Sequence, residues 1–586
     1  MTRSLSLSHL FCLLYLLPAH LLLTQPILVQ PADAQNHMVY ESGGELIPGY
    51  AVYDVGFYDL DLKINPADSS IEGSVTTHAT IVHPTDHIVL DLDPRFSIHS
   101  IRLLQGGEGS DRGEVSESRQ DEELEFDRPG SDKHTRVMFS ETKQPGEKVV
   151  VEIRYSGKPL IAANPPWDGG FVWERTAEGE PWIGVAVQTV GAWTWWPNKD
   201  HPSDKADSLS LTFTLPEGLT VASNGVFRKT TVREEGWRSW HWFSSYPINN
   251  YNVTLNAAPY EVISDSYESV TGEKMEILFW VLPEAVERGM ELFPQFARQL
   301  RFLEELIGPY PFRGDKYGVA HAPYLGMEHQ TLIAYGASFE NNNLYGVDIG
   351  FDDLHQHELS HEWWGNLVTA WDWKDFWIHE GFGTYMQALY AEYLGGEGPY
   401  NELMAYFRRQ IRSLKEVAPR KSQTTVDVSG SGRGGDIYYK GAWFLHTLRY
   451  LMGDEPFFTL LRRFAYPDGS VASGKDDAGR FVTTDDFLTL ASEVHGESLE
   501  WLFEHYLRQA ELPVLVAQRE GSTLSLHWET VGVKSFPMPV ELNLDGERQV
   551  VTPGREGISV EVSDNVPVEL DPDRRILMEV IQEGSN

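Results

Sequence analysis

Cysteine is almost absent from this sequence of 586 residues, because its single cysteine, Cys12, lies in an apolar stretch near the first residue. No disulfide can therefore form within the chain. No small residue directly precedes Cys12, which argues against a lipid-bearing cysteine. Any metal site has to be built from histidine and carboxylate side chains.

Lysine and arginine are also scarce, with 47 of them against 86 aspartates and glutamates, which gives a formal net charge of −39. A surplus of this size repels nucleic-acid phosphates and anionic membrane surfaces. We therefore expect no nucleic-acid partner, and the acidity itself indicates solubility or a saline habitat. Disorder of the whole chain is excluded, since 41% of the residues are hydrophobic and 12% are aromatic.

The sequence has a single long apolar run, at residues 10–23, which Pro18 and His20 interrupt. This run is shorter than the about 20 apolar residues that span a membrane. Arg3 precedes the run and an A-x-A pattern ends at Ala34, as in a secretory signal peptide. We predict that residues 1–34 are removed and that the protein is secreted or periplasmic, without stable membrane insertion after cleavage. The alternative is an uncleaved anchor.

The chain is too long for one hydrophobic core, and its patterning predicts a multidomain α+β protein. Residues 35–264 alternate with period two, which predicts an N-terminal β-sheet domain. Residues 265–512 are mainly helical, with a long helix predicted over residues 283–307 and a strand over residues 326–336. The alternation returns in residues 513–586, which predicts a small C-terminal β-sandwich.

The clearest chemical signal is the pentapeptide HELSH at residues 357–361. Helix positions i and i+4 share one face, about 5–6 Å apart at Cβ, so His357 and His361 can bind one metal ion. Glu358 lies roughly 100° around the helix, where it can serve as general base for a water beside the metal. We expect this helix to be half buried and to end at Gly365. The alternative interpretation of the pentapeptide alone is a solvated helix face with two histidines.

A carboxylate on the next predicted helix can complete the site. Glu380 lies in the first turn of a helical pattern over residues 377–394. Catalytic zinc commonly takes three protein ligands and a water, and thermolysin has a His₂Glu set of this kind. We therefore predict one Zn2+ per chain, bound by His357, His361 and Glu380. The alternative for Glu380 is a carboxylate that is favoured by the helix dipole.

Three motifs follow one another along the chain. Residues 357–380 have the spacing HExxH-x18-E, residues 325–329 read LGMEH and residues 438–442 read YYKGA. They resemble the zinc-binding, GxMEN and YxKG motifs of the aminopeptidase N and leukotriene hydrolase family of zinc peptidases. The resemblance implies a saddle-like N-terminal domain, a thermolysin-like α/β zinc catalytic domain and a zinc cofactor.

The resemblance also implies catalytic roles. Glu358 would take a proton from the attacking water and pass it to the leaving amine. Tyr438, the first tyrosine of YYKGA, would stabilise the oxyanion of the tetrahedral intermediate. Tyr439 is the competing candidate one residue along, although a core aromatic is the better interpretation for it.

An aminopeptidase also has to recognise the free N-terminus of its substrate. A carboxylate at a fixed distance from the metal can bind the ammonium group, and the family's motif implies this role for Glu328. We predict substrate contacts by three more residues of the motif, Gly326, Met327 and His329. Leu325 stands where the family usually has glycine, and His329 where it usually has asparagine.

The family takes a further substrate contact from its N-terminal domain. Gln188 matches the family's glutamine, and we predict that it contacts substrate. Two residues later, where the family has an acidic or amide residue, this chain has Val190. One anchor for the ammonium group is therefore lost. Either Glu328 suffices alone, or another acidic residue replaces the anchor, or the specificity is unusual. The tryptophans of residues 193–196 either line the cleft or pack in the core.

These inferences predict a zinc aminopeptidase that hydrolyses the N-terminal peptide bond of peptides with a free N-terminus. Two alternatives stay open. One is an endopeptidase-like or epoxide-hydrolysing enzyme on the same scaffold. The other is a catalytically silent binding protein, against which the full set of metal-binding and catalytic residue types argues.

Overall fold

The computed structural model describes residues 39–105, 121–129, 132–341, 343–429, 435–467, 479–563 and 566–583. The predicted signal peptide, residues 1–34, lies outside these ranges. Within them, no helix combines the length and the apolar character needed to cross a membrane.

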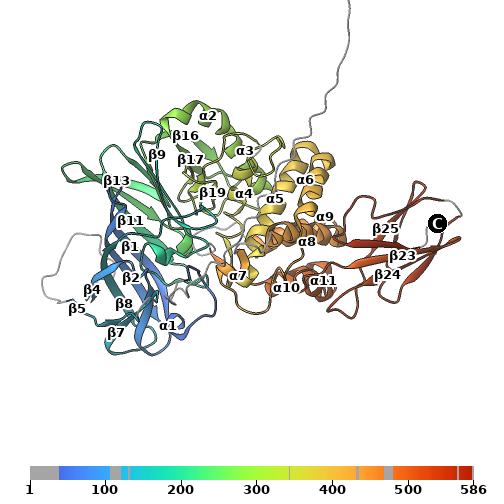
Figure 1. Cartoon of the computed structure of the whole chain (residues 1–586), viewed down its shortest axis with the longest axis horizontal. Helices are drawn as coiled ribbons and strands as arrows, with labels where there is room; N and C mark the ends of the chain where they lie inside the picture. The colour runs from blue at the N-terminus through green and yellow to red at the C-terminus, as the bar shows by residue number, and fades with distance from the viewer. Residues whose placement is uncertain are drawn as a thin grey trace, which may run out of the picture. The chain divides into compact units, whose positions relative to one another are not determined.

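An eight-stranded sheet dominates the N-terminal part of the fold, whose strands run from blue to green in Figure 1. Its strand β1 pairs antiparallel with β2 and parallel with β11. Along β1, Leu60, Leu62 and Ile64 are fully buried between half-buried polar neighbours, as period-two alternation requires. The strands, in order across the sheet, are β13 (Val226–Glu234), β14 (Trp237–Ser244), β11 (Ser208–Pro216), β1 (Tyr53–Asn65), β2 (Ser70–Ile81), β8 (Lys148–Gly157), β4 (Ser97–Leu103) and β5 (Glu122–Glu123).

Two smaller sheets and three short helices complete this part. One sheet contains β3 (Thr85–Asp91), β7 (His134–Lys143) and β6 (Phe126–Asp127). The other contains β12 (Thr220–Ser223), β15 (Leu255–Ala258), β10 (Pro181–Ala186) and β9 (Gly170–Arg175). The short helices are α1 (Pro48–Ala51), η1 (Ala192–Thr194) and η2 (Asn250–Asn252).

The middle of the chain combines a five-stranded sheet with most of the helices, drawn in green, yellow and orange in Figure 1. The sheet has the order β16 (Glu261–Glu268), β17 (Lys274–Val281), β18 (Tyr317–His321), β20 (Ile333–Tyr335) and β19 (Gly326–Met327). A pair of strands, β21 (Val368–Ala370) and β22 (Arg480–Val482), lies apart from it. The helices are η3 (Pro283–Ala285), α2 (Val286–Leu292), α3 (Pro294–Leu306), α4 (Asp353–Ser360), η4 (Trp373–Asp375), α5 (Trp377–Gly395), α6 (Glu397–Gln410), α7 (Thr425–Ser429), α8 (Asp436–Met452), α9 (Asp454–Ala465), α10 (Thr484–His495) and α11 (Glu500–Tyr506).

Two predicted elements differ from the observed ones. The helix expected over residues 283–307 is divided into η3, α2 and α3. The division between α2 and α3 falls at Pro294, which has no backbone N–H and begins a new helix. The strand expected over residues 326–336 is two short antiparallel strands, β19 and β20. Glu328 therefore lies in the connection between these strands, where a φ of 63° at Thr331 reverses the chain.

Two sheets form the C-terminal part. One contains β27 (Ile558–Glu561), β24 (Thr523–Glu529), β23 (Val514–Glu520) and β29 (Glu579–Glu583); the other contains β26 (Glu547–Val551), β25 (Val540–Leu544) and β28 (Val568–Leu570). Leu526 of the first sheet and Leu542 of the second are both fully buried. The α+β architecture with several domains confirms the predicted fold class. The predicted domain boundary at residue 264 falls inside β16, which pairs with β17 over its whole length.

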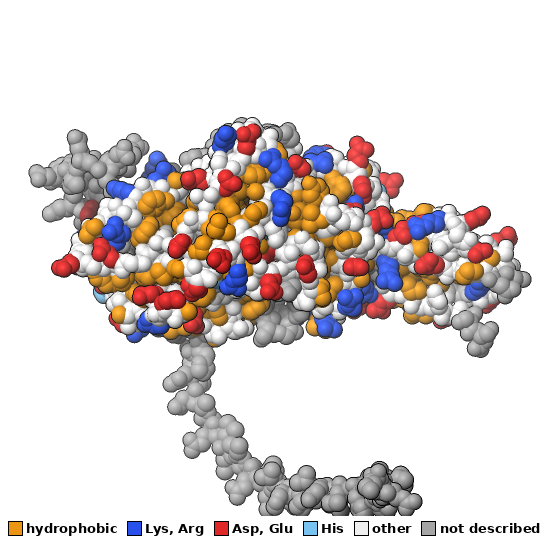
Figure 2. Space-filling view, turned by 90° about the horizontal axis from the view of Figure 1, so that it is seen from above, with side chains coloured by type: hydrophobic (Ala, Val, Ile, Leu, Met, Phe, Trp, Pro, Cys, Tyr) orange, Lys and Arg blue, Asp and Glu red, His pale blue; other side chains and the backbone are white. Residues whose placement is uncertain are grey.

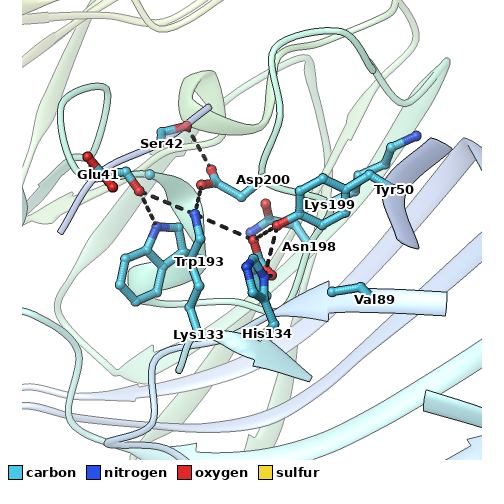
Figure 3. Close-up of polar contacts among 12 residues, drawn as sticks. Glu41, Ser42, Tyr50, Val89, Lys133, His134, Trp193, Asn198, Lys199 and Asp200 are labelled. Atoms are coloured by element: carbon cyan, nitrogen blue, oxygen red, sulfur yellow. Dashed lines mark hydrogen bonds and ion pairs between the residues drawn. The ribbon is translucent and has the colours of Figure 1, made fainter. Parts of the chain in front are cut away.

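Glu41 and Ser42 belong to the folded body, as Figure 3 shows. The carbonyl oxygen of Glu41 accepts hydrogen bonds from Lys133 Nζ at 3.3 Å and from Trp193 Nε1 at 3.1 Å. The hydroxyl of Ser42 donates to Asp200 Oδ1 at 3.0 Å. These contacts fix the segment against the N-terminal sheets.

The same segment also reaches α7. The backbone N–H of Ser42 donates to Thr425 Oγ1 at 2.9 Å, and the N–H of Thr425 donates to the Ser42 carbonyl at 3.0 Å. Thr425 Oγ1 in turn donates to the carbonyl of Thr189 at 2.6 Å. Ser42 therefore helps to hold α7 against a loop of the N-terminal part.

Charged side chains of both signs lie on the face shown in Figure 2. On this face acidic side chains are interspersed with basic ones rather than gathered over one element.

Candidate active site

The HELSH pentapeptide lies at the end of α4 (Asp353–Ser360). Asp352 caps this helix, since its carboxylate accepts a hydrogen bond at 2.8 Å from a backbone N–H of the first turn. The helix ends earlier than the predicted Gly365, and all but one of its residues are buried, so it is not half exposed. His361 still has helical dihedrals, φ −66° and ψ −17°, and its ring stays on the same face as that of His357.

Three donor atoms face one another at this helix end. His357 Nε2 and His361 Nε2 are 3.2 Å apart, and Glu380 Oε2, from the first turn of α5, lies 3.3 Å and 3.5 Å from them. Tetrahedral zinc with bonds of about 2.0–2.2 Å separates its ligand atoms by about 3.3–3.6 Å. The predicted His₂Glu set therefore has the spacing that zinc requires.

The polar contacts of these donors also fit a cation. His361 Nδ1 lies 2.9 Å from the carbonyl oxygen of Trp364. Because a carbonyl oxygen only accepts, Nδ1 carries the hydrogen and Nε2 keeps a lone pair for the metal. Glu380 Oε2 is buried and has no hydrogen-bond partner among the described residues. A cation at the centre of the three donors satisfies both groups, so these residues fit zinc.

The charged groups of the site also favour a bound metal cation. Burial raises the pKa of Glu358, and the nearby Glu328 raises it further. Burial lowers the pKa of His361, but Glu380 and the two other carboxylates raise it to about 10. Three buried carboxylates thus share the site with two histidines. The raised pKa values of Glu358 and His361 mean that both hold protons in the metal-free site, and a divalent cation would displace the proton on His361 Nε2 when it binds.

Two glycines allow α5 and α8 to cross with their backbones in contact. A Cβ atom on Gly441 would lie 2.9 Å from the Cα of Gly381, closer than real Cβ atoms come. Glu380 directly precedes Gly381 along α5, and Tyr438 lies one turn before Gly441 on α8. The close crossing therefore places Tyr438 beside the metal donors.

Gly441→Val is expected to lower both Tm and kcat. The added methyl groups have to push α8 away from α5 and carry Tyr438 with it, and overpacking of this kind costs about 1–3 kcal/mol. We expect kcat to fall by at least about tenfold, since misplacement by about 1 Å is enough for that. Calorimetry and steady-state kinetics test both effects. Gly398→Ala is the matched control, because nothing lies within 4 Å of a Cβ there. Wild-type kcat in Gly441→Val would show that the crossing does not position Tyr438.

Glu358 extends from α4 toward the edge strand β19. A Cβ atom on Gly326 would lie 2.5 Å from Glu358 Oε1, so a side chain at this position of the LGMEH motif would displace the Glu358 carboxylate. One donor atom from each of Glu328, Glu358 and His361 lies within 4.8 Å of the others. The structure therefore brings the predicted base and the predicted amine-binding carboxylate to the metal site.

Glu328 is buried and held by three side chains from the N-terminal part and by Asn366 from the middle part. Gln188 Nε2 and the Tyr251 hydroxyl both donate to its Oε1, the second at 3.0 Å. Asn366 Nδ2 and Asn252 Nδ2 donate to its backbone carbonyl at 3.0 Å and 3.2 Å. The sequence predicts that Gln188 contacts substrate, and it indicates no role for the tyrosine or for the two asparagines.

The two tyrosines of YYKGA have different surroundings. The ring of Tyr438 lies 6.1 Å from that of His357, measured between centroids. Burial raises the pKa of Tyr438 well above its usual value, and Glu380 raises it further, so its hydroxyl keeps its proton and can donate. Tyr439 packs against Phe407 with ring centroids 5.6 Å apart. It is only half-buried and also lines the cavity, so the structure does not make it a core aromatic.

Some of the other residues considered in the sequence analysis line the cavity, and others are buried away from it. Gly326 and Met327 line the cavity at the metal donors, whereas His329 does not. The ring of His329 is fully buried, and burial lowers its pKa to about 3, so it is neutral. Val190 is buried as well and provides no polar group to the cavity. The tryptophans of residues 193–196 are fully buried in the core and do not line the cavity.

The cavity itself has a volume of about 580 Å³. The metal donors, Glu358, Glu328 and Tyr438 form part of its wall. Much of the rest is apolar or aromatic, including Trp167, Met327, Leu344, Tyr345 and Ile437. No lysine or arginine lines it in the part of the chain that the structure describes.

Comparisons with known proteins find aminopeptidases among the relatives of this chain. The chain is 25% identical over 435 residues to aminopeptidase B of Rattus norvegicus, which is 70% of this chain and 62% of that protein. It is 24% identical over 410 residues to endoplasmic reticulum aminopeptidase 1 of Homo sapiens, 68% of this chain and 42% of that protein. The chain thus spans less than two thirds of the length of either relative.

A solved structure shows the same fold. The crystal structure of an M1 zinc metallopeptidase from Deinococcus radiodurans superposes with a TM-score of 0.61 at 24% identity. The match covers 78% of this chain and 94% of that one.

Two family models match the chain in the order that this fold requires. The Peptidase M1 N-terminal domain matches residues 56–251, and the Peptidase family M1 domain matches residues 296–506. Together they cover more than half of the 586 residues. The second match includes all three zinc donors and both catalytic candidates, and the first includes the glutamine that contacts the amine-binding carboxylate. Because both domain models match and all three zinc donors are present, the chain belongs to peptidase family M1.

Proposed function

We propose that the protein is a zinc-dependent aminopeptidase that hydrolyses the first peptide bond of peptides with a free N-terminus. The observation that carries this proposal is the position of Glu328, which has a donor atom within 4.8 Å of those of Glu358 and His361. The α-nitrogen and the carbonyl carbon of one amino acid are about 2.5 Å apart. An ammonium group bound to Glu328 therefore leaves the carbonyl of the same residue beside the metal donors. The names of the relatives, aminopeptidase B and endoplasmic reticulum aminopeptidase 1, support the proposal.

Each residue of the site has its own role in the proposed reaction. Bound by His357, His361 and Glu380, zinc supplies a Lewis acid that lowers the pKa of water and polarises a carbonyl group. Glu358 takes the proton of the attacking water and delivers it to the leaving amine. Its place between α4 and Gly326 keeps the carboxylate directed into the cavity.

Tyr438 stabilises the negative charge that develops on the substrate carbonyl oxygen. Its hydroxyl donates a hydrogen bond to that oxygen, a contact that strengthens as the charge forms. The stacked His357 ring and the crossing of α8 with α5 hold Tyr438 in place before substrate binds.

The experiment that tests the function is a paired assay. Zinc is quantified in the purified protein, and cleavage of leucine p-nitroanilide is compared with cleavage of its N-acetylated form. We expect cleavage of the free amine alone and its loss on chelation. Cleavage of both forms would indicate an endopeptidase-like enzyme. Cleavage of neither, with zinc bound, would favour the epoxide-hydrolysing enzyme or the binding protein.

Glu328→Ala is expected to lower kcat/KM for the free-amine substrate by about 10²–10³-fold, because loss of one partner of a buried charge pair costs about 2–5 kcal/mol. The residual rate on the N-acetylated substrate should not change, since that substrate has no ammonium group. The ratio of the two kcat/KM values measures the effect. Equal losses on both substrates would remove the proposed role of Glu328.

We further propose that residues 1–34 are a signal peptide and that the mature protein is secreted or periplasmic. Arg3, the apolar run and the A-x-A pattern at Ala34 support this. Cleavage after Ala34 leaves intact the segment of Glu41 and Ser42, which is hydrogen-bonded into the fold. Mass spectrometry of the exported protein tests the proposal, with Gln35 expected as its first residue. An exported protein that still begins at Met1 would favour an uncleaved anchor.

A further inference from the structure

Trp167 lines the catalytic cavity, and 59% of its side chain is exposed. Single exposed apolar side chains are common on proteins and by themselves carry no function. The position of Trp167 distinguishes it, because the cavity that it borders also contains the metal donors and Glu328. Its indole is therefore within the space that a substrate enters.

The loop that carries Trp167 is fixed. The backbone N–H of Gly169 donates to Thr189 Oγ1 at 3.2 Å. Pro165 and Pro166 directly precede the tryptophan and restrict their own φ angles to about −65°. An aromatic side chain on a fixed loop offers a large contact surface at a small loss of conformational entropy.

The Trp167 loop is hydrogen-bonded to Thr189, close to Glu328, the residue proposed to bind the substrate amine. Thr189 directly follows Gln188, whose amide donates to Glu328. A Cβ atom on Gly169 would lie 2.9 Å from Val190 Cγ2, so the valine packs directly beneath the loop. The apolar residue at the position of the lost amine anchor therefore has a structural role, which is to support the Trp167 loop.

The chemistry of the cavity wall favours an apolar substrate side chain. The three carboxylates on the wall, Glu328, Glu358 and Glu380, already have proposed roles with the amine, the water and the metal. No further carboxylate and no lysine or arginine lines the cavity within the described ranges. Among the described residues of the wall, a charged substrate side chain would thus have no free charged partner, whereas apolar and aromatic groups are matched.

Building on the proposed aminopeptidase function, we infer that Trp167 contacts the side chain of the substrate's N-terminal residue and gives the enzyme a preference for large apolar or aromatic residues at that position. Trp167 binds substrate and takes no part in the chemical step.

Three dipeptide amides test this inference, Phe-Ala, Ala-Phe and Ala-Ala. In Trp167→Ala we expect KM for the Phe-Ala amide to rise by about tenfold with kcat unchanged, because the contact is the same in the ground state and the transition state. The other two amides should change by less than about twofold, since they present only a methyl group to the indole. Trp167→Phe should restore most of the loss.

Ile161→Ala is the matched control, since Ile161 is also 59% exposed and precedes the same loop but does not line the cavity. A loss that falls on the Ala-Phe amide would place Trp167 on the leaving side and overturn the inference. Equal losses on all three amides would mean that the substitution acts through the fold, and would also overturn it. A wild-type protein that prefers an Arg-Ala amide to the Phe-Ala amide would overturn the inference as well. If the wild-type protein cleaves none of the amides, the proposed function fails instead, and the inference with it.

Discussion

Glu358→Gln is expected to lower kcat by about 10²–10⁴-fold, the range in which general bases contribute to catalysis. Glutamine keeps the shape of the side chain but has no oxygen basic enough to take a proton from water. Zinc should remain at one per chain, because the three predicted ligands are His357, His361 and Glu380. The substitution also replaces a buried carboxylate, whose pKa burial raises, by a neutral group, so we expect Tm to be unchanged or higher.

The measurement combines kcat on a free-amine substrate with metal analysis of the same sample. Glu402→Gln makes the same chemical change at an exposed position of α6 and should leave every value unchanged. A near-normal kcat in Glu358→Gln would refute the assignment of the base. A loss of zinc together with activity would make Glu358 a ligand rather than a base.

Local spacing determines the features that were predicted correctly. The separation of four residues between His357 and His361 places their rings on one helix face, whatever the surrounding fold. The alternation along β1 likewise predicts which of its residues are buried. The division at Pro294 could also have been predicted, because proline begins helices more readily than it continues them.

Contacts between distant parts of the chain determine the features that were missed. Gln188 and Glu328 are separated by 140 positions, and no local pattern pairs them. The motif that contains His329 predicts the path of the backbone but not the side to which each side chain turns, and this ring turns into the core. The sequence around Trp167 reads as a turn rich in proline and glycine, which gives no sign that it borders a cavity.

Glu380→Gln is expected to abolish activity through loss of zinc. The amide keeps the size of the side chain but removes the negative charge, and only the two histidines remain as ligands. Loss of an outer-shell hydrogen-bond partner already costs about 10–100-fold in metal affinity, so loss of a direct ligand should cost more. We expect zinc to be lost on dialysis that leaves the wild-type protein loaded, and activity to fall with it.

Thermal unfolding distinguishes a ligand from the alternative role of Glu380, a carboxylate that interacts with the helix dipole. Zinc that binds only the folded state at 1,000 times its Kd stabilises it by about 4 kcal/mol, so added zinc should raise Tm of the wild-type protein and not of Glu380→Gln. In the presence of a chelator the variant should still be the less stable protein. Glu380 then pairs with the imidazolium of His361, whose pKa it raises to about 10, and removal of one partner of a buried pair is destabilising. The zinc-dependent change in Tm therefore makes the distinction, and an equal rise in Tm of the variant would show that Glu380 is no ligand, as the helix-dipole interpretation requires.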